Sequence, residues 1–245
     1  KLEKQIISFK NGLAELPQLL VAALGEAIHA NVSISSIQKI GASWRVDWNG
    51  KPHIYDEVLL TTPAHALDKL PLDESLQKSL QPLQAIDYSP VSVLTVAFKH
   101  SDVAQPLNGF GVLVPECEGR KILGVLFPAS LFTCRAPAGE VLLTVFVGGE
   151  RQAELAVSDK DSLIATVLPE LKELFGATGE PTFSHHRHWP RAIPQYNLGY
   201  GKILAQMDAI EKKFAGLKLA GNYRDGISLS YCIESAVSIN RHLTE

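Results

Sequence analysis

The chain has 245 residues and a formal net charge of -3 at pH 7, with 46% hydrophobic and 20% charged residues. This composition is typical of a folded globular protein and argues against an intrinsically disordered chain. Because no long run of Lys or Arg occurs, the sequence does not favour a nucleic-acid-binding surface. The length allows one large domain or two small ones.

The cysteines and the apolar segments indicate the kind of cellular compartment in which the protein works. Cys117, Cys134 and Cys232 lie too far apart for a Cys-x-x-Cys redox pair or a zinc knuckle. An odd number of cysteines, with no leader-like pattern in the first residues given, fits a reducing environment. No apolar run approaches the ~20 residues of a transmembrane helix. We therefore expect a cytoplasmic protein whose membrane contact, if it has any, is peripheral.

The N-terminal part of the chain carries both strand and helix signals. A short strand, a turn at Asn11-Gly12 and an amphipathic helix with Leu13, Leu16 and Leu20 on one face are expected first. The following elements are strands near 32–40 and 43–48, a hairpin turn at Asn49-Gly50, the strand "EVLLTTP", and helices in "AHALDKL" and "DESLQKSLQPLQ".

A β-rich segment begins near Tyr88. Strands are predicted in "YSPVSVLTVAFKH", "GFGVLVP", "KILGVLF", "EVLLTVFVGG" and "TFSHHRHW", with a helix at about 159–175 before the last of them. The end of the chain again mixes α and β signals: a helix at about 201–214, the strand "LKLAG" and a final helix that starts at Ser228. The predicted fold class is mixed α+β.

The sequence offers no convincing nucleophile, general base or metal set. In "SHHRHW", His186 and His188 would share one face of a strand and His185 the other, but no carboxylate partner lies nearby. There is no G-x-S-x-G elbow and no Walker loop. Such an absence is informative if the chemistry belongs to a cofactor.

One stretch has the form of a nucleotide site. "LAGNYRDGISLSYCIESA" runs from a strand end through Gly221 and Gly226 into a helix that starts at Ser228. Such a turn places main-chain N–H groups and a helix N-terminus beside an anionic ligand. Taken alone the pattern is common in α/β proteins, and the usual opening motif, G-x-G-x-x-G, does not occur in this chain.

Six motifs in one order carry a resemblance. They are "FKNGLAELPQLL", "DEVLLTTPAHAL", "GFGVLVP", "GVLFPASLFTCRAPAGEVLLTVFVGG", "HRHWPRAIPQYNLGY" and "LAGNYRDGISLSYCIESA". Together they resemble the C-terminal half of the protoporphyrinogen oxidase branch of the flavin amine oxidase superfamily, over essentially the whole chain. The resemblance implies an FAD-binding part at 1–71 and 191–245 and a mixed β-sheet substrate domain at 72–190.

The resemblance also implies cofactor contacts. Val32 would meet the adenine end of FAD through its main chain. Thr61, Thr62 and Pro63 would face the cofactor from a strand end. Gly221 and Asn222 match the turn on the pyrophosphate side, although many superfamily members carry an acidic residue where Asn222 stands.

Substrate contacts and a reaction are implied in the same way. Ile227, Ser228 and Leu229 would present the start of the last helix to the flavin ring. In the substrate domain, three residues match positions that line the tetrapyrrole pocket of relatives: Leu113, Leu126 and Phe146. The implied reaction converts protoporphyrinogen IX to protoporphyrin IX in two-electron steps. Hydride would pass from a ring-bridging carbon to FAD, and dioxygen would reoxidise the flavin to give hydrogen peroxide.

The resemblance covers about half of a typical family member. The glycine turn that opens the FAD site is expected outside this chain, as is an arginine that binds a substrate propionate. We therefore expect the chain to be a fragment that alone binds FAD weakly or not at all and has no oxidase activity.

Three alternatives remain at this point. The substrate could be coproporphyrinogen III rather than protoporphyrinogen IX. Both are porphyrinogens with similar faces, and they differ in propionate number. The chain could belong to a more distant flavin oxidoreductase, such as an amine oxidase or carotenoid desaturase. It could instead be a non-catalytic tetrapyrrole-binding module. The sequence leaves a homodimer open.

Overall fold

The computed structural model describes residues 6–244, with side chains described to residue 240. The chain divides into two compact units. The first consists of residues 6–85, 199–225 and 232–244, and the second of residues 86–198 and 226–231.

The first unit contains a small antiparallel sheet and a short parallel strand pair. The sheet has the order β1 (Ile34–Ile40), β2 (Ser43–Trp48), β3 (Lys51–Tyr55), and β4 (Val58–Leu60) pairs in parallel with β10 (Leu217–Leu219). Its helices are α1 (Glu15–Leu24), α2 (Glu74–Leu80), α6 (Gly201–Lys213) and most of α7 (Leu229–Thr244), with short 3-10 turns at Gly25–Ala27, Ala64–Lys69 and Gln81–Ala85.

Local sequence explains several of these boundaries. The turn between β2 and β3 is formed by Asn49 and Gly50, which both have positive φ, as a tight hairpin requires. Helix α2 begins after Asp73, whose carboxylate accepts the Leu76 N–H at 2.9 Å. The core of this unit is formed by fully buried large side chains: Trp44, Leu67, Leu76, Leu83, Met207 and Tyr223.

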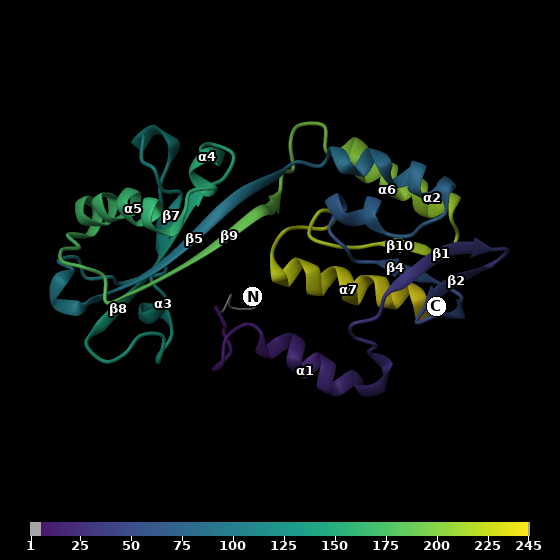
Figure 1. Ribbon diagram of the computed structural model, residues 1–245, viewed down its shortest axis with the longest axis horizontal. Coiled ribbons are helices and arrows are strands. Elements are labelled where there is room, and N and C mark those ends of the chain that lie inside the picture. Colours follow the sequence, from purple (N-terminus) through teal and green to yellow (C-terminus); the bar gives the residue numbers. More distant parts are fainter. Residues whose placement is uncertain (1–5, 245) are drawn as a thin grey trace, which may run out of the picture. The chain divides into compact units, whose positions relative to one another are not determined.

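The second unit is a five-stranded antiparallel sheet with helices. The strand order is β6 (Gly111–Leu113), β7 (Gly124–Leu126), β8 (Glu140–Gly148), β5 (Tyr88–Lys99), β9 (Phe183–Pro194). Helices α4 (Ala153–Ala156) and α5 (Lys160–Phe175) lie against one face of the sheet (Figure 1), and α3 (Pro128–Leu131) is a single turn between β7 and β8.

One face of this sheet forms the core of the second unit. Leu94, Val96, Val125, Leu143 and Val145 from the strands pack with Leu163, Val167 and Leu171 of α5, and all of them are buried. Because successive residues of a strand point to opposite faces, the neighbours of these core residues lie on the other face. The buried residues of α5 listed above pack on the core face and not on that second face.

The mixed α+β class is confirmed, and so are most predicted elements. The stripe Leu163, Val167, Leu171 of the long helix is fully buried, whereas Leu174 is only partly buried. Two predictions are wrong in detail: residues 6–9 form no strand (residues 1–5 lie outside the described part), and "AHALDK" forms a 3-10 helix. A separate strand, Lys51–Tyr55, precedes β4 because the hairpin turn pairs it with β2.

The boundaries between the units also differ from the predicted ones at 71/72 and 190/191. Residues 72–85 belong to the first unit because the Ile37 N–H donates to Pro71, the Asp73 N–H donates to Ile37, and α2 packs on the neighbouring 3-10 turns. Residues 191–198 belong to the second unit because β9 continues to Pro194 and pairs with β5 as far as Tyr88.

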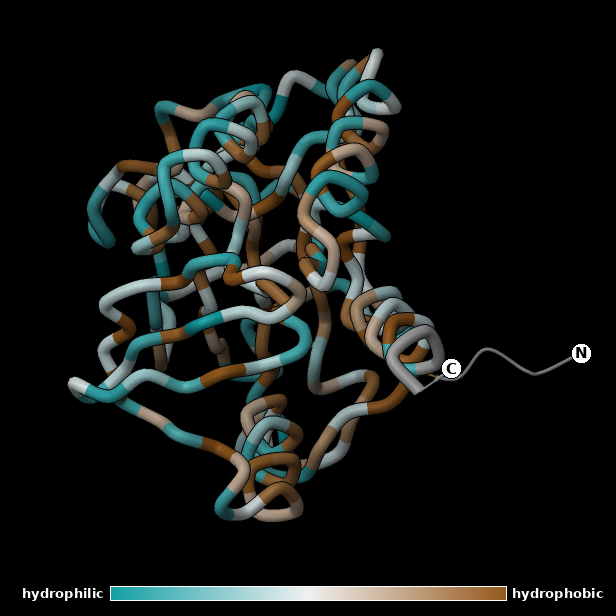
Figure 2. Tube along the Cα trace, turned by 90° about the vertical axis from the view of Figure 1, so that its right-hand side faces the viewer, coloured by the Kyte–Doolittle hydropathy of each residue, from teal (hydrophilic) through white to brown (hydrophobic). Residues whose placement is uncertain are grey.

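Hydrophobic and hydrophilic residues alternate along the trace in Figure 2. Among the described helices, none has the length and apolar character needed to cross a membrane.

Candidate functional site

The carboxyl ends of β4 and β10 meet at one edge of the parallel pair. Leu219 lies beside Leu60 in the register, and the Ala220 N–H donates to the Leu60 carbonyl at 3.0 Å. The two segments that leave this edge are 61–63 and 220–223. In open α/β sheets, ligands bind outside the carboxyl ends of parallel strands, so this edge is a natural ligand site.

A pocket of about 430 Å³ opens at this edge. Its walls come from the two strand ends and from one side of α7, and the lining residues are Leu59, Thr61, Pro63, Ala220, Gly221, Asn222, Tyr223, Cys232, Ser235, Ala236 and Ile239. Most of these side chains are small or apolar, so main-chain groups are within reach of a ligand. This character suits a cofactor held by its main-chain contacts and shape.

Gly221 is required by the turn that forms one pocket wall. Its φ is 149°, and a Cβ added there would lie 2.7 Å from the ring of Tyr223, which is fully buried. The Arg224 N–H donates to the Gly221 carbonyl at 3.0 Å, which closes the turn. Tyr200, the residue just before α6, donates its hydroxyl hydrogen to the Tyr223 carbonyl. This hydrogen bond also holds the turn in place.

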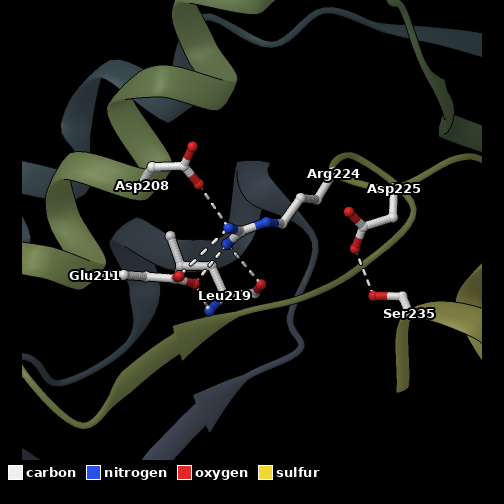
Figure 3. Close-up of polar contacts among 6 residues, drawn as sticks. All are labelled: Asp208, Glu211, Leu219, Arg224, Asp225 and Ser235. Atoms are coloured by element: carbon white, nitrogen blue, oxygen red, sulfur yellow. Dashed lines mark hydrogen bonds and ion pairs between the residues drawn. The ribbon is translucent and has the colours of Figure 1, made fainter. Parts of the chain in front are cut away.

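A charged cluster fixes the same turn to β10 and α6. The Arg224 guanidinium donates to the carboxylates of Glu211 and Asp208 and to the Leu219 carbonyl, while Glu211 accepts the Leu219 N–H at 2.7 Å (Figure 3). The side chains of Arg224 and Glu211 are only 17% and 14% exposed. The main-chain groups at the end of β10 are therefore held by an ion pair that is itself largely shielded from water.

Helix α7 begins with a side-chain cap. The Ser228 hydroxyl accepts the Tyr231 N–H at 3.2 Å, which is the usual bond of an N-cap residue. Further along the helix, the Ser235 hydroxyl donates to Asp225. The capped helix runs on to supply Cys232, Ser235, Ala236 and Ile239 to the pocket wall.

The pocket brings together four of the residues that the resemblance assigns to FAD: Thr61, Pro63, Gly221 and Asn222. Thr62 lies between two of them, and its Oγ1 is buried with no hydrogen-bond partner among the described residues. Val32 is half-buried just before β1 and is not among the described residues that line this pocket. Ile227, Ser228 and Leu229 are exposed in the segment that leads into α7.

These features fit part of a dinucleotide cofactor. Two parallel strand ends, a glycine turn and a buried hydroxyl without a partner are what such a group would contact. Within the part of the chain that the structure describes, no three His, Cys, Asp or Glu side chains are arranged to hold a metal ion.

The three residues assigned to the tetrapyrrole lie on one face of the five-stranded sheet. In the register, Leu113 pairs with Gly124, Gly124 with Phe146, and Leu126 with Thr144. Directly paired residues point to the same face and so do residues two apart, so Leu113, Leu126 and Phe146 share the face opposite the core. We call this set, with the paired residues Gly111, Gly124, Thr144 and Val93, the open face.

Two glycines keep the open face flat. A Cβ on Gly124 would lie 2.6 Å from the Val112 carbonyl oxygen and 3.4 Å from the Leu113 side chain, and one on Gly111 would lie 2.2 Å from the Val125 carbonyl oxygen. Glycine therefore allows β6 and β7 to approach closely and leaves a gap between Leu113 and Phe146. Leu113 is 89% exposed, whereas Leu126 and Phe146 are half-buried.

The histidines of β9 divide between the two faces, as predicted. His186 and His188 point to the core side, where the fully buried Ser92 hydroxyl donates to the Ala156 carbonyl at 2.6 Å. His186 Nε2 lies 2.8 Å from the same hydroxyl and therefore donates to it. Burial is the main cause that lowers the pKa of His186, and the neighbouring His188 and His185 lower it further. This histidine is a structural group that ties β9 to β5.

Sequence reasoning missed the Arg224–Glu211 cluster and an arginine on the open face. Arg224 follows the turn "AGNY" directly, but its partners are distant in sequence on α6. Arg187 could have been placed opposite Val93 only from the strand register. The first depends on the packing of the turn on α6, and the second on the strand register.

Comparison with known proteins gives a consistent result. The model of flavin-containing amine oxidoreductases matches residues 1–239. The mitochondrial protoporphyrinogen oxidase of Nicotiana tabacum is 40% identical over 185 residues, which cover 74% of this chain and 37% of that protein. The coproporphyrinogen III oxidase of Staphylococcus aureus is 23% identical over 235 residues, which cover 94% of this chain and 50% of that protein.

A solved structure shares the fold. A candidate protoporphyrinogen oxidase from Exiguobacterium sp. superposes with a TM-score of 0.77 at 24% sequence identity, covering 96% of this chain and 51% of that one. The chain thus spans between about a third and a half of the length of these relatives. On the family match over residues 1–239, the chain belongs to the flavin-containing amine oxidoreductases.

Proposed function

We propose that this chain supplies the substrate face and one wall of the flavin site of an enzyme that oxidises protoporphyrinogen IX to protoporphyrin IX, with dioxygen as acceptor. The observation that carries the proposal is the placement of Leu113, Leu126 and Phe146 together on the face that the core does not use. The faces of a tetrapyrrole macrocycle are largely apolar and need a broad apolar surface, which the two glycines of this face help to keep open.

The first unit has a separate role in this proposal. Thr61, Thr62, Pro63, Gly221 and Asn222 would hold part of FAD at the pocket beside β4 and β10, and Val32 would contribute at its adenine end. Ile227, Ser228 and Leu229, in the segment 226–231 that belongs to the second unit, would meet the flavin ring. When bound, the flavin would supply the capacity to accept hydride from the substrate. The protein residues would then bind, orient and shield the reactants.

The domain roles follow from the same assignment. The substrate would bind to the second unit, whose main segment is 86–198 where the sequence predicted 72–190, and FAD would bind mainly to the first unit. A cytoplasmic location with peripheral membrane contact is a part of the proposal that rests on the sequence alone, and the proposal leaves the oligomeric state open.

One assay on two proteins tests the proposal. Protoporphyrinogen IX is supplied to the purified 245-residue chain and to the product of the full open reading frame that encodes it, and the fluorescence of the protoporphyrin formed is followed. We expect oxidation by the full product and none by the 245-residue chain, which would also purify without a bound-flavin absorption band. Full-length protein that binds FAD and leaves protoporphyrinogen untouched would contradict the proposal.

The second candidate substrate is coproporphyrinogen III, and the similarity to the Staphylococcus aureus protein favours it. Both porphyrinogens would use the same open face and differ in their propionates. The same assay with the two substrates separates the candidates by kcat/KM. Porphyrin binding by a full-length product that oxidises neither substrate would instead favour a non-catalytic tetrapyrrole-binding module.

A further inference from the structure

The open face continues across the sheet to β9. Phe146 pairs with Val93 of β5, and Val93 pairs with Arg187 of β9, so Arg187 points to the same face as Phe146. Two strand spacings separate Phe146 from Arg187, about 10 Å between the main chains. Trp189, two residues further along β9, pairs with Val91 and shares this face.

Arg187 is held in place without a charged partner. Its guanidinium carbon lies 4.8 Å from the centre of the Trp189 ring, a cation–π contact on a ring that is 47% exposed. Among the described side chains, Arg187 forms no ion pair with a carboxylate. The positions paired across this face place a carboxylate only at Glu140, which lies opposite Lys99 at the far end of β5.

A positive charge beside an apolar surface favours a particular kind of ligand. The ligand would be a flat apolar ring that carries a carboxylate on a short arm, so that the ring covers Leu126 and Phe146 while the carboxylate reaches the guanidinium. A guanidinium presents a fork of N–H donors that matches a carboxylate, and stacking on Trp189 reduces the freedom lost on binding.

We propose that Arg187 is a specificity-determining residue that binds a propionate carboxylate of the tetrapyrrole on the open face. This assignment rests on the proposed function, because it presumes that a tetrapyrrole occupies the face. It adds a carboxylate contact that the apolar residues cannot supply. His185, which pairs with Thr95, is the nearest titratable group of β9 on the same face.

The test compares a porphyrin that has free propionates with one that lacks them. Protoporphyrin IX and protoporphyrin IX dimethyl ester are titrated into the 245-residue chain and into Arg187→Gln, Arg187→Lys and Lys172→Gln variants. The shift of the Soret band and the quenching of Trp fluorescence give the affinities. Lys172 is the matched control, because it is an exposed cation on α5, which covers the opposite face.

We expect Arg187→Gln to weaken protoporphyrin IX binding about tenfold and to leave the dimethyl ester unchanged. Arg187→Lys would recover part of the loss, and Lys172→Gln would have no effect. Equal losses for the acid and the ester would mean that Arg187 only shapes the apolar surface, which overturns the assignment.

The remaining outcomes separate this inference from the proposed function. If the unsubstituted chain binds protoporphyrin IX and Arg187→Gln binds it equally well, the Arg187 assignment is wrong while the proposed function stands. If the unsubstituted chain binds neither porphyrin, the Arg187 assignment is wrong for this chain, whereas the proposed function is decided separately by the oxidation assay on the full product.

Discussion

The pocket beside β4 and β10 and the open face of the five-stranded sheet are built in different ways. The pocket is formed by strand ends, a glycine turn and small side chains, and a largely shielded ion pair holds its shape. The open face is formed by side chains that project from paired strands, and Leu113 and Trp189 on it are exposed to solvent.

This difference teaches where each region is vulnerable. A site made of main-chain groups depends on whatever fixes the main chain, so residues outside the pocket control it. A site made of projecting side chains depends on the sheet register, which the opposite face already fixes through the core. We therefore expect substitutions near the pocket to cost stability and substitutions on the open face to cost binding.

The largest effect is expected at the cluster that fixes the pocket turn. Replacing Arg224 by Met leaves the shielded carboxylate of Glu211 without its partner, and breaking a pair of this kind typically costs ~3 kcal/mol. Urea unfolding of the chain measures the loss. The matched control is Lys78→Met, which removes an exposed i,i+4 pair with Glu74 and should cost ~0.3–0.5 kcal/mol. Similar losses in both variants would mean that the cluster does not fix the turn.

The next largest effect is expected at Gly124, where a close approach of the main chain shapes the open face. Gly124→Ala places a methyl group 2.6 Å from the Val112 carbonyl oxygen and in the gap beside Leu113. Backbone displacement between β6 and β7 should cost ~1–3 kcal/mol and also weaken porphyrin binding. Gly201→Ala, at the start of α6 where an added Cβ meets nothing within 4 Å, should be neutral or slightly stabilising. Unchanged stability and binding in Gly124→Ala would show that the face is not closely packed.

A smaller effect is expected in the pH dependence of stability, which should depend on a histidine of the core face of the sheet more than on one of the open face. His186 is buried against Ser92 on the core face, and its pKa is lowered mainly by burial, with Asp159 opposing the shift and Lys160 adding to it. The unfolded chain, whose histidine titrates near 6.5, therefore takes up a proton first as the pH falls. The contribution to stability is complete above pH 6.5 and is lost progressively below it.

Melting temperatures followed by circular dichroism between pH 7.5 and pH 5.5 measure this loss. His186→Gln keeps an N–H donor for Ser92 without a titrating group, so it should flatten the pH dependence. His185→Gln, on the open face, should flatten the dependence much less than His186→Gln, because His185 contributes to the lowered pKa of His186 only after burial and His188. A flat profile in the unsubstituted chain would contradict the assignment of His186.

The sequence predicts these two regions to different degrees. Helix α5 and strand β8 follow from local periodicity, because their buried stripes are regular. Three residues of the open face, Leu113, Leu126 and Phe146, were named from a resemblance. Their common face needed the register of β6, β7 and β8, which pairs segments far apart in the chain. Local patterns carry no information about such pairing.

The pocket was harder still to predict. The motifs around Thr61 and Gly221 could be located by resemblance, but the ion pair that fixes the turn joins Arg224 to Glu211 and Asp208 on another element. The unit boundaries were displaced for a similar reason: Pro71 and Asp73 bond to β1, so packing between distant segments, rather than composition, decides where the first unit ends. Tertiary hydrogen bonds of this kind leave no periodic signal in a sequence.

The smallest effect concerns the hydroxyl of Thr62, in the pocket region. Its Oγ1 is buried and, among the described residues, forms no hydrogen bond, so the fold gains nothing from its polarity. Thr62→Val keeps the shape and removes the unpaired group, so the free energy of unfolding should stay within ~0.5 kcal/mol of the original or rise slightly.

If the hydroxyl of Thr62 serves the cofactor, the same substitution in the full open reading frame should lower FAD affinity without changing stability. Thr166→Val on α5, whose hydroxyl bonds to the Ser162 carbonyl, is the control that should leave FAD affinity unchanged. A Thr62→Val protein that loses stability while retaining its flavin would show that this hydroxyl belongs to the fold and not to the cofactor site.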